Sequence, residues 1–297
     1  MSSTGGLIEP ALLRRLEHLN LSTKRRFAST QTGDRRSDRR GLSIEFSDYR
    51  EYQLGDDLRY VDWKAYGRLE KLFLKLFLDE EDLNVHLLID SSSSMGFGSP
   101  MSKRAYAQRA AAAIGFVALY KNNRVDAAAF TTGIAGRVLP MRGEKSIPVF
   151  LRQLAKMPET GGETAFSQVV AQYAATAPPA GLVVIFSDFF DPSIPTALAA
   201  LVGRRHQVVL VQVLDRAEVD PQITGDLSLV DSETGQTHEV ALSDYEIEQY
   251  LVRLSQYTEE LTMTARKFGM DFIRVVSDEP VENLVLKSLR SAGIVVG

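Results

Sequence analysis

The sequence predicts an α/β protein with a doubly wound, mostly parallel sheet and helices on both faces. From about residue 83 onward, short apolar runs alternate with longer segments of helical spacing, which is typical of consecutive strand–helix–strand units. Residues 85–89 and 182–186 are largely apolar, as expected for strands that are buried on both faces. An aspartate closes each run, Asp90 after the first and Asp188 after the second.

The individual elements follow from the spacing of apolar residues. In residues 103–121, apolar side chains recur three or four positions apart, which indicates a helix. By the same criterion, further helices are expected at 146–155, 166–175, 194–202, 245–268 and 281–292. Strands are expected at 85–89, 125–131, 182–186, 207–214 and 272–276, with an edge strand at 135–140 and a hairpin over 227–240.

The region before residue 83 predicts two smaller segments. Residues 1–40 contain a short helix at 11–21 and a polar, basic stretch from Lys24 to Arg40, which we interpret as partly mobile. Residues 41–82 are rich in aromatic and charged side chains and include a strand at 71–77. We therefore expect an N-terminal segment over 1–40, a small β-rich appendage over 41–82, and the α/β domain over 83–297.

The composition excludes several classes of site. The 297 residues include no cysteine, so disulfides, thiolate metal sites and cysteine nucleophiles are excluded. The formal net charge of -4 gives no global attraction to nucleic acid or to anionic membranes. Residues 1–10 show no signal-peptide pattern, and no apolar run is long enough to cross a bilayer. We expect a cytoplasmic protein without a membrane span.

The Asp90 loop carries the clearest chemical signal in the chain. Asp90 opens the run Asp-Ser-Ser-Ser-Ser directly after a predicted buried strand. Ligands bind beyond the carboxyl ends of the strands in such sheets, and alternation along the chain places Ser92 and Ser94 on the same side as Asp90. One carboxylate and two hydroxyls form an all-oxygen set that suits Mg²⁺, with Mn²⁺ or Ca²⁺ as alternatives. The structural alternative is an ordinary helix N-cap.

The pattern around this loop resembles the metal-ion-dependent adhesion site of von Willebrand factor A domains. The five residues that carry the resemblance are Asp90, Ser92, Ser94, Thr164 and Asp188. The resemblance covers about residues 83–292 and implies a Rossmann-like von Willebrand factor A fold. It also implies that these side chains bind a metal ion whose coordination is completed by an acidic side chain of a partner. In that family the threonine directly follows glycine, whereas Glu163 intervenes here, so Thr160 is the alternative to Thr164.

A second resemblance lies upstream, between Arg50 and Trp63. This segment contains Gly-Asp-Asp-Leu-Arg-Tyr-Val-Asp-Trp and resembles the signature of a bacterial family, number 58 among the domains of unknown function. In that family the signature precedes an adhesion-site domain, so the resemblance extends over about 40–292. Leu54 stands where the family has proline, and many relatives carry membrane helices that this sequence does not show. The resemblance implies a companion of MoxR-type AAA+ ATPases, acting as an adaptor in chaperone-like assembly or metal insertion.

The expected function is therefore not enzymatic, and we assign no catalytic residue. We expect a metal-dependent adaptor that binds a carboxylate of a MoxR-type AAA+ ATPase, of an acidic client protein, or of both. A metal-dependent hydrolase is one alternative, although such sites normally have a second acid two residues after the first and Ser92 stands there. Nucleic-acid binding through the basic residues 24–40 is the other alternative, and such binding would weaken steeply with salt.

Overall fold

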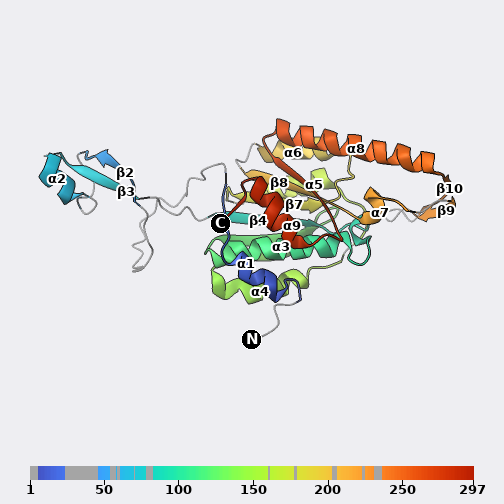
Figure 1. The fold of residues 1–297 in the computed structure, drawn as a ribbon, viewed down its shortest axis with the longest axis horizontal. Coiled ribbons are helices and arrows are strands. Elements are labelled where there is room, and N and C mark those ends of the chain that lie inside the picture. The colour runs from blue at the N-terminus through green and yellow to red at the C-terminus, as the bar shows by residue number, and fades with distance from the viewer. Residues whose placement is uncertain are drawn as a thin grey trace. The chain divides into compact units, whose positions relative to one another are not determined.

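In the computed structural model, the chain folds into two compact units (Figure 1). The larger unit comprises residues 1–25 and 83–297, and the smaller unit comprises residues 26–82. The residues that the structure describes are 6–23, 46–53, 58, 61–69, 71–77, 83–159, 161–176, 179–202, 206–222, 225–230 and 236–297.

A six-stranded sheet forms the centre of the larger unit. Its strand order is β11-β8-β7-β4-β5-β6; the first five strands run parallel, and β6 pairs antiparallel with β5 at one edge. Every residue of β7 and β8 is buried, as expected for parallel strands covered on both faces. The strands are β4 (Asn84–Asp90), β5 (Arg124–Phe130), β6 (Ile134–Arg142), β7 (Leu182–Ser187), β8 (Gln207–Leu214) and β11 (Asp271–Val276).

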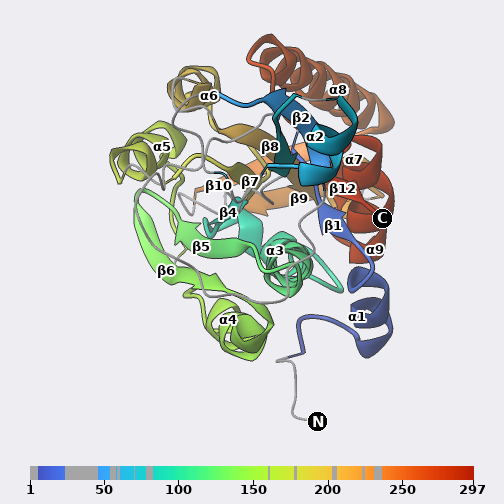
Figure 2. The ribbon, with the colours of Figure 1, turned by 90° about the vertical axis from the view of Figure 1, so that its left-hand side faces the viewer.

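Helices cover both faces of this sheet (Figure 2). One face carries α5 (Phe166–Ala175), α6 (Ile194–Val202) and α8 (Asp244–Lys267). The other face carries α1 (Pro10–Leu16), α3 (Lys103–Tyr120), α4 (Ile147–Ala155) and a C-terminal helical segment formed by α9 (Val281–Asn283), a π-helical turn (Leu284–Ser288) and α10 (Leu289–Ser291). Most residues of α3 are buried because α1, α4 and the C-terminal segment pack against it. A helix that is apolar on all sides is expected to be enclosed in this way.

The N-terminal residues pack into the larger unit. After α1, the strand β1 (Asn20–Leu21) pairs antiparallel with β12 (Val295–Val296), near the other end of the chain. The sequence places residues 1–40 in a separate segment and extends the first helix to residue 21. In the structure the helix ends at Leu16, and apolar burial holds residues 6–23 against the α/β core. The basic residues 24–40 lie outside the described residues. The buried side chains are Ile8, Leu12, Leu16, Leu19 and Leu21.

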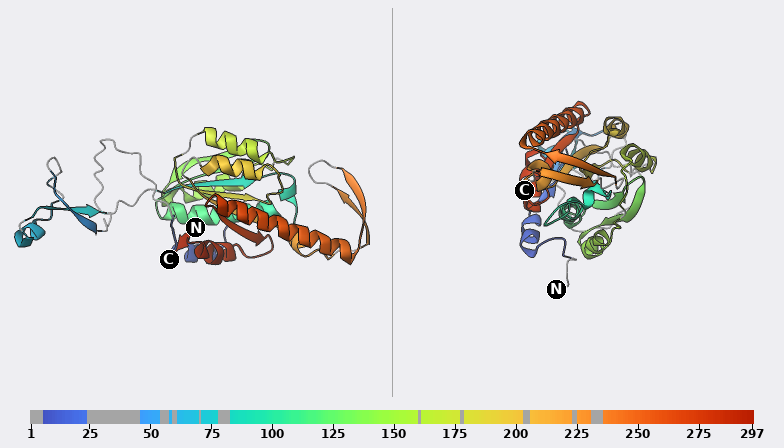
Figure 3. Two further views of the ribbon diagram at one scale, coloured as in Figure 1. Left: turned by 90° about the horizontal axis from the view of Figure 1, so that it is seen from above. Right: turned by 90° about the vertical axis from the view of Figure 1, so that its right-hand side faces the viewer.

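A hairpin and a long helix extend past the sheet on the side of the strands' carboxyl ends (Figure 3). After β8 comes α7 (Arg216–Val219), and then β9 (Gly225–Val230) pairs antiparallel with β10 (Thr237–Leu242). The buried residues of α8 are Leu254, Leu261 and Ala265. Residues 244–253, at the start of the helix, therefore contribute little to the core of the unit.

In the residues of the smaller unit that the structure describes, the chain forms one hairpin and one short helix. Strand β2 (Phe46–Glu51) pairs antiparallel with β3 (Phe73–Phe77), and α2 (Trp63–Leu69) lies between them in sequence. Asp62 caps α2: its Oδ1 accepts the backbone N–H groups of Lys64 and Ala65 at 2.9 and 3.2 Å, and its Oδ2 accepts the Tyr49 hydroxyl at 2.8 Å. This aspartate of the upstream signature thus has a local structural role. The Gly-Asp-Asp part of the signature lies outside the described residues.

The mixed α/β architecture predicted from the sequence is confirmed in its coarse form. A six-stranded, mostly parallel sheet is flanked by helices, and the strands and helices after residue 83 begin and end close to the expected positions. The last predicted helix differs in detail because a π-helical turn interrupts it at Leu284–Ser288.

Candidate functional site

Asp90 is the last residue of β4 and Asp188 directly follows β7, at the point where the strand order reverses. From β4 the chain continues to β5 on one side, and it later returns to β7 on the other side. Strands β4 and β7 are paired and parallel, so their carboxyl ends lie at the same edge of the sheet. In open α/β sheets, ligands bind in the crevice at this reversal. The candidate residues from the sequence therefore meet at the switch point of the sheet.

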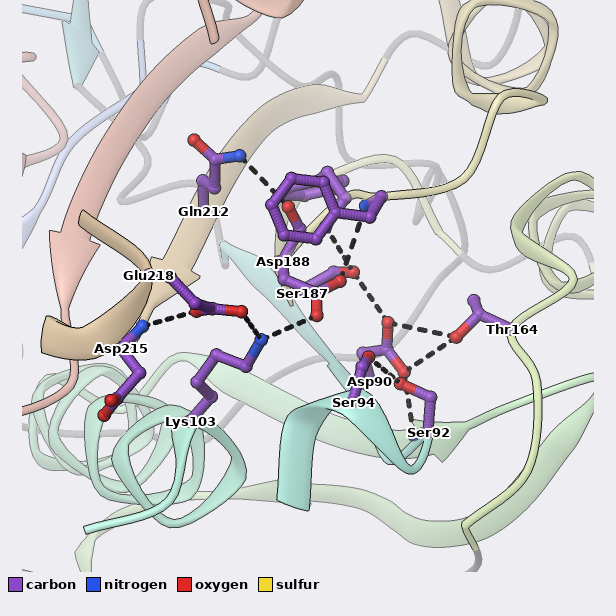
Figure 4. Close-up of polar contacts among 12 residues, drawn as sticks. Asp90, Ser92, Ser94, Lys103, Thr164, Ser187, Asp188, Gln212, Asp215 and Glu218 are labelled. Atoms are coloured by element: carbon purple, nitrogen blue, oxygen red, sulfur yellow. Dashed lines mark hydrogen bonds and ion pairs between the residues drawn. The ribbon is translucent and has the colours of Figure 1, made fainter. Parts of the chain in front are cut away.

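Asp90 is a buried carboxylate contacted by hydroxyl and backbone donors (Figure 4). Asp90 as a whole residue is 1% exposed. Asp90 Oδ1 accepts the backbone N–H of Ser92 at 2.9 Å, and Oδ2 accepts the Ser187 hydroxyl at 2.6 Å. The Thr164 hydroxyl lies 3.3 Å from Oδ1 and 3.4 Å from Oδ2. These donors are all neutral, so they orient the carboxylate without balancing its charge.

The surroundings of Asp90 disfavour its ionised form. Burial raises the pKa of Asp90 most, and the charge of Asp188 raises it further. Hydrogen bonds from Ser187 and Ser92 lower the pKa, but the balance leaves it at about 6, compared with an ordinary value of 3.8. A buried carboxylate in this situation is stabilised by any cation that binds beside it.

The hydroxyls of Ser92 and Ser94 lie side by side next to Asp90. Ser92 is buried, and its Oγ is 3.1 Å from Ser94 Oγ. A single turn of 3-10 helix, Ser94–Gly96, follows directly and sets the direction in which the loop leaves the strand. The carboxylate and the two hydroxyls form an all-oxygen group of the kind that hard divalent cations bind.

A second loop is joined to the Asp90 loop through Ser93. The Ser93 N–H donates to the carbonyl oxygen of Gly162 at 3.0 Å, and the Gly162 N–H donates to Ser93 Oγ at 2.7 Å. Gly161 and Gly162 have φ values of 64° and 84°, in the left-handed region that glycine adopts without strain. This glycine turn brings Thr164 to the carboxylate of Asp90.

Asp188 contacts a buried lysine. Lys103, the first residue of α3, is 1% exposed, and its Nζ lies 2.9 Å from Asp188 Oδ2 and 2.7 Å from Glu218 Oε1 (Figure 4). Burial opposes the charge of the ammonium group, but the two carboxylates outweigh burial and raise the pKa of Lys103. Gln212 Nε2 donates to the backbone carbonyl of Asp188 at 3.0 Å, which fixes the chain at this strand end.

The structure joins four of the five predicted site residues by hydrogen bonds. Ser92 and Thr164 bond directly to Asp90, and Ser94 joins the group through Ser92. Asp188 is near enough for its charge to act on Asp90, but its carboxylate pairs with a lysine. Thr160, the alternative to Thr164, lies outside the described residues. Metal binding by this set stays a prediction.

Three further contributors were not predicted from the sequence: Ser93, Ser187 and Lys103. Ser187 directly precedes Asp188, and no sequence motif indicates that its hydroxyl donates a hydrogen bond to Asp90 at the end of the neighbouring strand. Ser93 lies within a run of four serines, so its separate role depends on where the glycine turn packs. Lys103 begins a predicted helix, where a lysine is nearly always exposed, and only the approach of Glu218 and Asp188 reveals its burial.

The described part of the chain, including the surroundings of Asp90, contains no group of three or more His, Cys, Asp or Glu side chains that could hold a metal ion. The candidate set itself consists of three hydroxyls and the carboxylates of Asp90 and Asp188.

His86 is buried at the opposite end of β4, where Nδ1 is 2.7 Å from Asp126 Oδ2 and Nε2 is 3.0 Å from the carbonyl oxygen of Pro179. Both ring nitrogens of His86 thus serve the fold.

The fold and the site together define an α/β protein with an oxygen-rich group at the switch point of its sheet. Residues 48–260 match the family described as "Protein of unknown function DUF58", and the chain belongs to this family. Uncharacterized proteins of Mycobacterium bovis and of two Mycobacterium tuberculosis strains are each 28% identical to it over 277 residues, covering 92% of this chain and 87% of theirs. The family resemblance carried by the upstream signature is thereby confirmed.

Two solved structures share weaker likeness with the chain. A conserved hypothetical protein, BatB, from Bacteroides thetaiotaomicron has a TM-score of 0.40 at 15% identity, covering 65% of this chain and 90% of that one. An aerotolerance-related membrane protein from Bacteroides fragilis has a TM-score of 0.45 at 18% identity, covering 70% and 97%. In the described part of the chain, no helix combines the length and the apolar character that crossing a bilayer requires.

Proposed function

We propose that this protein is a metal-dependent, protein-binding adaptor whose larger unit is a von Willebrand factor A-type domain. In this proposal the metal-ion-dependent adhesion site consists of Asp90, Ser92, Ser94, Thr164 and Asp188. The observation that carries the proposal is the carboxylate of Asp90, which is buried, has a raised pKa and is contacted by neutral donors.

The side chains around Asp90 fit a hard divalent cation such as Mg²⁺. All of the candidate donor atoms are oxygens, and three of the five candidate residues supply hydroxyls, which carry no charge. When bound, the ion would supply a positive, Lewis-acidic centre at the edge of the sheet. Because the hydroxyls neutralise little of its charge, the ion keeps affinity for an added anion. A carboxylate of a partner protein is the anion that this proposal assigns.

The proposed partner is a MoxR-type AAA+ ATPase, an acidic client protein, or both. What supports this part is the family resemblance, together with two exposed aromatic residues beside the site. Phe97 follows the Asp90 loop and is 51% exposed, and Phe190 follows Asp188 and is 48% exposed. Aromatic side chains of this kind are enriched in protein interfaces.

Capture of a purified MoxR-type ATPase from the same organism tests the proposal. The immobilised protein is compared in Mg²⁺ and in EDTA, as wild type, as Asp90→Asn and as Glu259→Gln. Glu259 is exposed on α8, so its variant removes the same charge away from the site. We expect retention in Mg²⁺ by wild type and Glu259→Gln, and loss of retention in EDTA or with Asp90→Asn. Equal retention in all samples would refute a metal-dependent contact, and no retention in any sample would refute this partner.

A further inference from the structure

The buried ion pair at Asp188 is the feature of the site that metal binding alone does not explain. Lys103 is 1% exposed, whereas lysine is almost never fully buried unless it is paired. Lys103 also stands in the first turn of α3, where the helix dipole disfavours a positive charge. Two carboxylates and the ring of Phe190, whose centroid is 5.9 Å from Nζ, surround the ammonium group. Burial and the helix dipole thus disfavour the charge of Lys103, and its contacts with the two carboxylates and the ring of Phe190 stabilise it there.

The two carboxylate partners of Lys103 differ in how firmly they are held. Glu218 is fixed by α7: it is the third residue of the helix and part of its capping box, in which its Oε2 accepts the backbone N–H of Asp215 at 2.6 Å. The Asp215 side chain in turn accepts a hydrogen bond from the Ser277 hydroxyl at 2.9 Å. Asp188 instead belongs to the candidate metal set and lies beside Asp90. One ammonium group therefore bridges a carboxylate of the fold and a carboxylate of the site.

We propose that Lys103 is a positioning residue that competes with the metal ion for Asp188, and that Glu218 holds the ammonium group when the metal ion takes Asp188. This inference rests on the proposed metal site. Without metal, the Lys103–Asp188 contact neutralises the second aspartate. With metal, Lys103 stays in place through Glu218 and adds a second positive charge beside the ion. The site would then favour an anionic ligand, which strengthens the assignment of a partner carboxylate.

Competition of this kind has a thermodynamic consequence. If Lys103 binds Asp188 only in the metal-free state, removing Lys103 must tighten metal binding, because the contact no longer has to be given up. Removing the Glu218 carboxylate must weaken metal binding. Of the two carboxylates that contact Lys103, only Asp188 then remains, so the lysine competes more strongly for it. A purely structural lysine would change the stability of the fold and leave the metal affinity unchanged.

Calorimetric titration of Mn²⁺ into the full chain separates these cases. The decisive variant is the double substitution Lys103→Met with Glu218→Gln, since it removes one positive and one negative charge and keeps the net charge of the wild type. We expect the double variant to bind Mn²⁺ more tightly than wild type by on the order of tenfold. We expect Glu218→Gln alone to bind Mn²⁺ several-fold more weakly.

The outcomes are distinguishable from those of the proposed function. If wild type binds no Mn²⁺, the metal site itself is refuted. If wild type binds Mn²⁺ and the double variant binds it equally or more weakly, competition by Lys103 is refuted. Should the double variant not fold, as judged by circular dichroism, Glu218→Gln decides, because it retains the Lys103–Asp188 contact: weaker Mn²⁺ binding supports the proposal, and unchanged or tighter binding overturns it.

Discussion

Asp90 and Asp188 end neighbouring strands of one sheet, yet the protein treats their charges differently. Asp90 is contacted by hydroxyls and a backbone N–H, and its pKa is raised to about 6. Asp188 is contacted by the ammonium group of Lys103 at 2.9 Å. The comparison teaches that the fold neutralises one acid of the pair with its own cation and leaves the other without one. An added metal ion is therefore expected to be stabilised most beside the carboxylate of Asp90, the uncompensated acid of the pair.

The difference between Asp90 and Asp188 matters for both the stability of the fold and the binding of a metal ion. Burying an unpaired carboxylate is costly, and two of them side by side would repel one another. The Lys103–Asp188 contact balances one of these charges, which lowers the cost of forming the larger unit without a metal ion. Four experiments test this contrast, from the largest expected effect to the smallest.

Breaking the compensated pair should have the largest effect on stability. Lys103→Met leaves the carboxylates of Asp188 and Glu218 without their shared cation, and we expect a loss of about 3–5 kcal/mol in the free energy of unfolding. Urea unfolding of the metal-free protein measures this loss. Lys103→Arg retains the charge and should lose less. A loss below about 1 kcal/mol in Lys103→Met would show that the pair is not an important counter-ion contact.

Neutralising Asp90, which has no cationic side chain beside it among the described residues, should stabilise the metal-free protein. The pKa of Asp90 is higher in the folded state than its ordinary value of 3.8, so protonation favours folding, and stability falls as the pH rises from about 4 through 6. Asp90→Asn removes this loss and should be more stable than wild type above pH 6 by up to about 3 kcal/mol. Unfolding in EDTA at a series of pH values measures the difference. A difference that does not change with pH would contradict the raised pKa.

Removing the hydroxyl of Thr164 should affect the metal site more than the fold. Its contacts with Asp90 are long, at 3.3 and 3.4 Å, so we expect Thr164→Ala to lower the stability of the metal-free protein by at most about 1 kcal/mol. If Thr164 contributes a ligand, its loss should weaken Mn²⁺ binding by about tenfold or more. Thr164→Ser keeps the hydroxyl and serves as the control. Wild-type Mn²⁺ affinity in Thr164→Ala would remove this residue from the site.

The smallest effect is expected in the turn that carries Thr164 to Asp90. Gly162 has a φ of 84°, and a Cβ there would meet no atom within 4 Å. Gly162→Ala should therefore lose about 1 kcal/mol through backbone strain alone. Gly96→Ala is the matched control, because Gly96 has equal space without a positive φ. Equal stability of the two variants by urea unfolding would show that the turn is not held in the left-handed conformation.

Much of the larger unit could be predicted from the sequence because its strands and helices have clear periodicities. Residues 182–186 and 207–214 read as buried strands, and the structure has β7 and β8 at these positions. The parallel direction of β4 and β7 follows from the helices between them, and it is what brings Asp90 and Asp188 to one edge. Local patterns were therefore sufficient for the position of the candidate site.

The charge balance of the site could not be predicted in the same way. Lys103 and Asp188 are 85 positions apart, and Glu218 is 115 positions from Lys103. No local pattern records which of the two aspartates the lysine reaches, because that depends on how α3 and α7 pack at the end of the sheet. The N-terminal residues show the same limit. Leu12 and Leu16 mark a helix, but their burial depends on α3, which lies far along the chain.

The most direct test of the central claim is a calorimetric titration of Mn²⁺ into metal-free wild type, Asp90→Asn and Glu259→Gln. The central claim is that the uncompensated carboxylate of Asp90 is the centre of a metal site. We expect one Mn²⁺ ion to bind wild type and Glu259→Gln with equal affinity, and Asp90→Asn to show no saturable binding while it remains folded. Equal binding by all three proteins, or none by wild type, would contradict the claim.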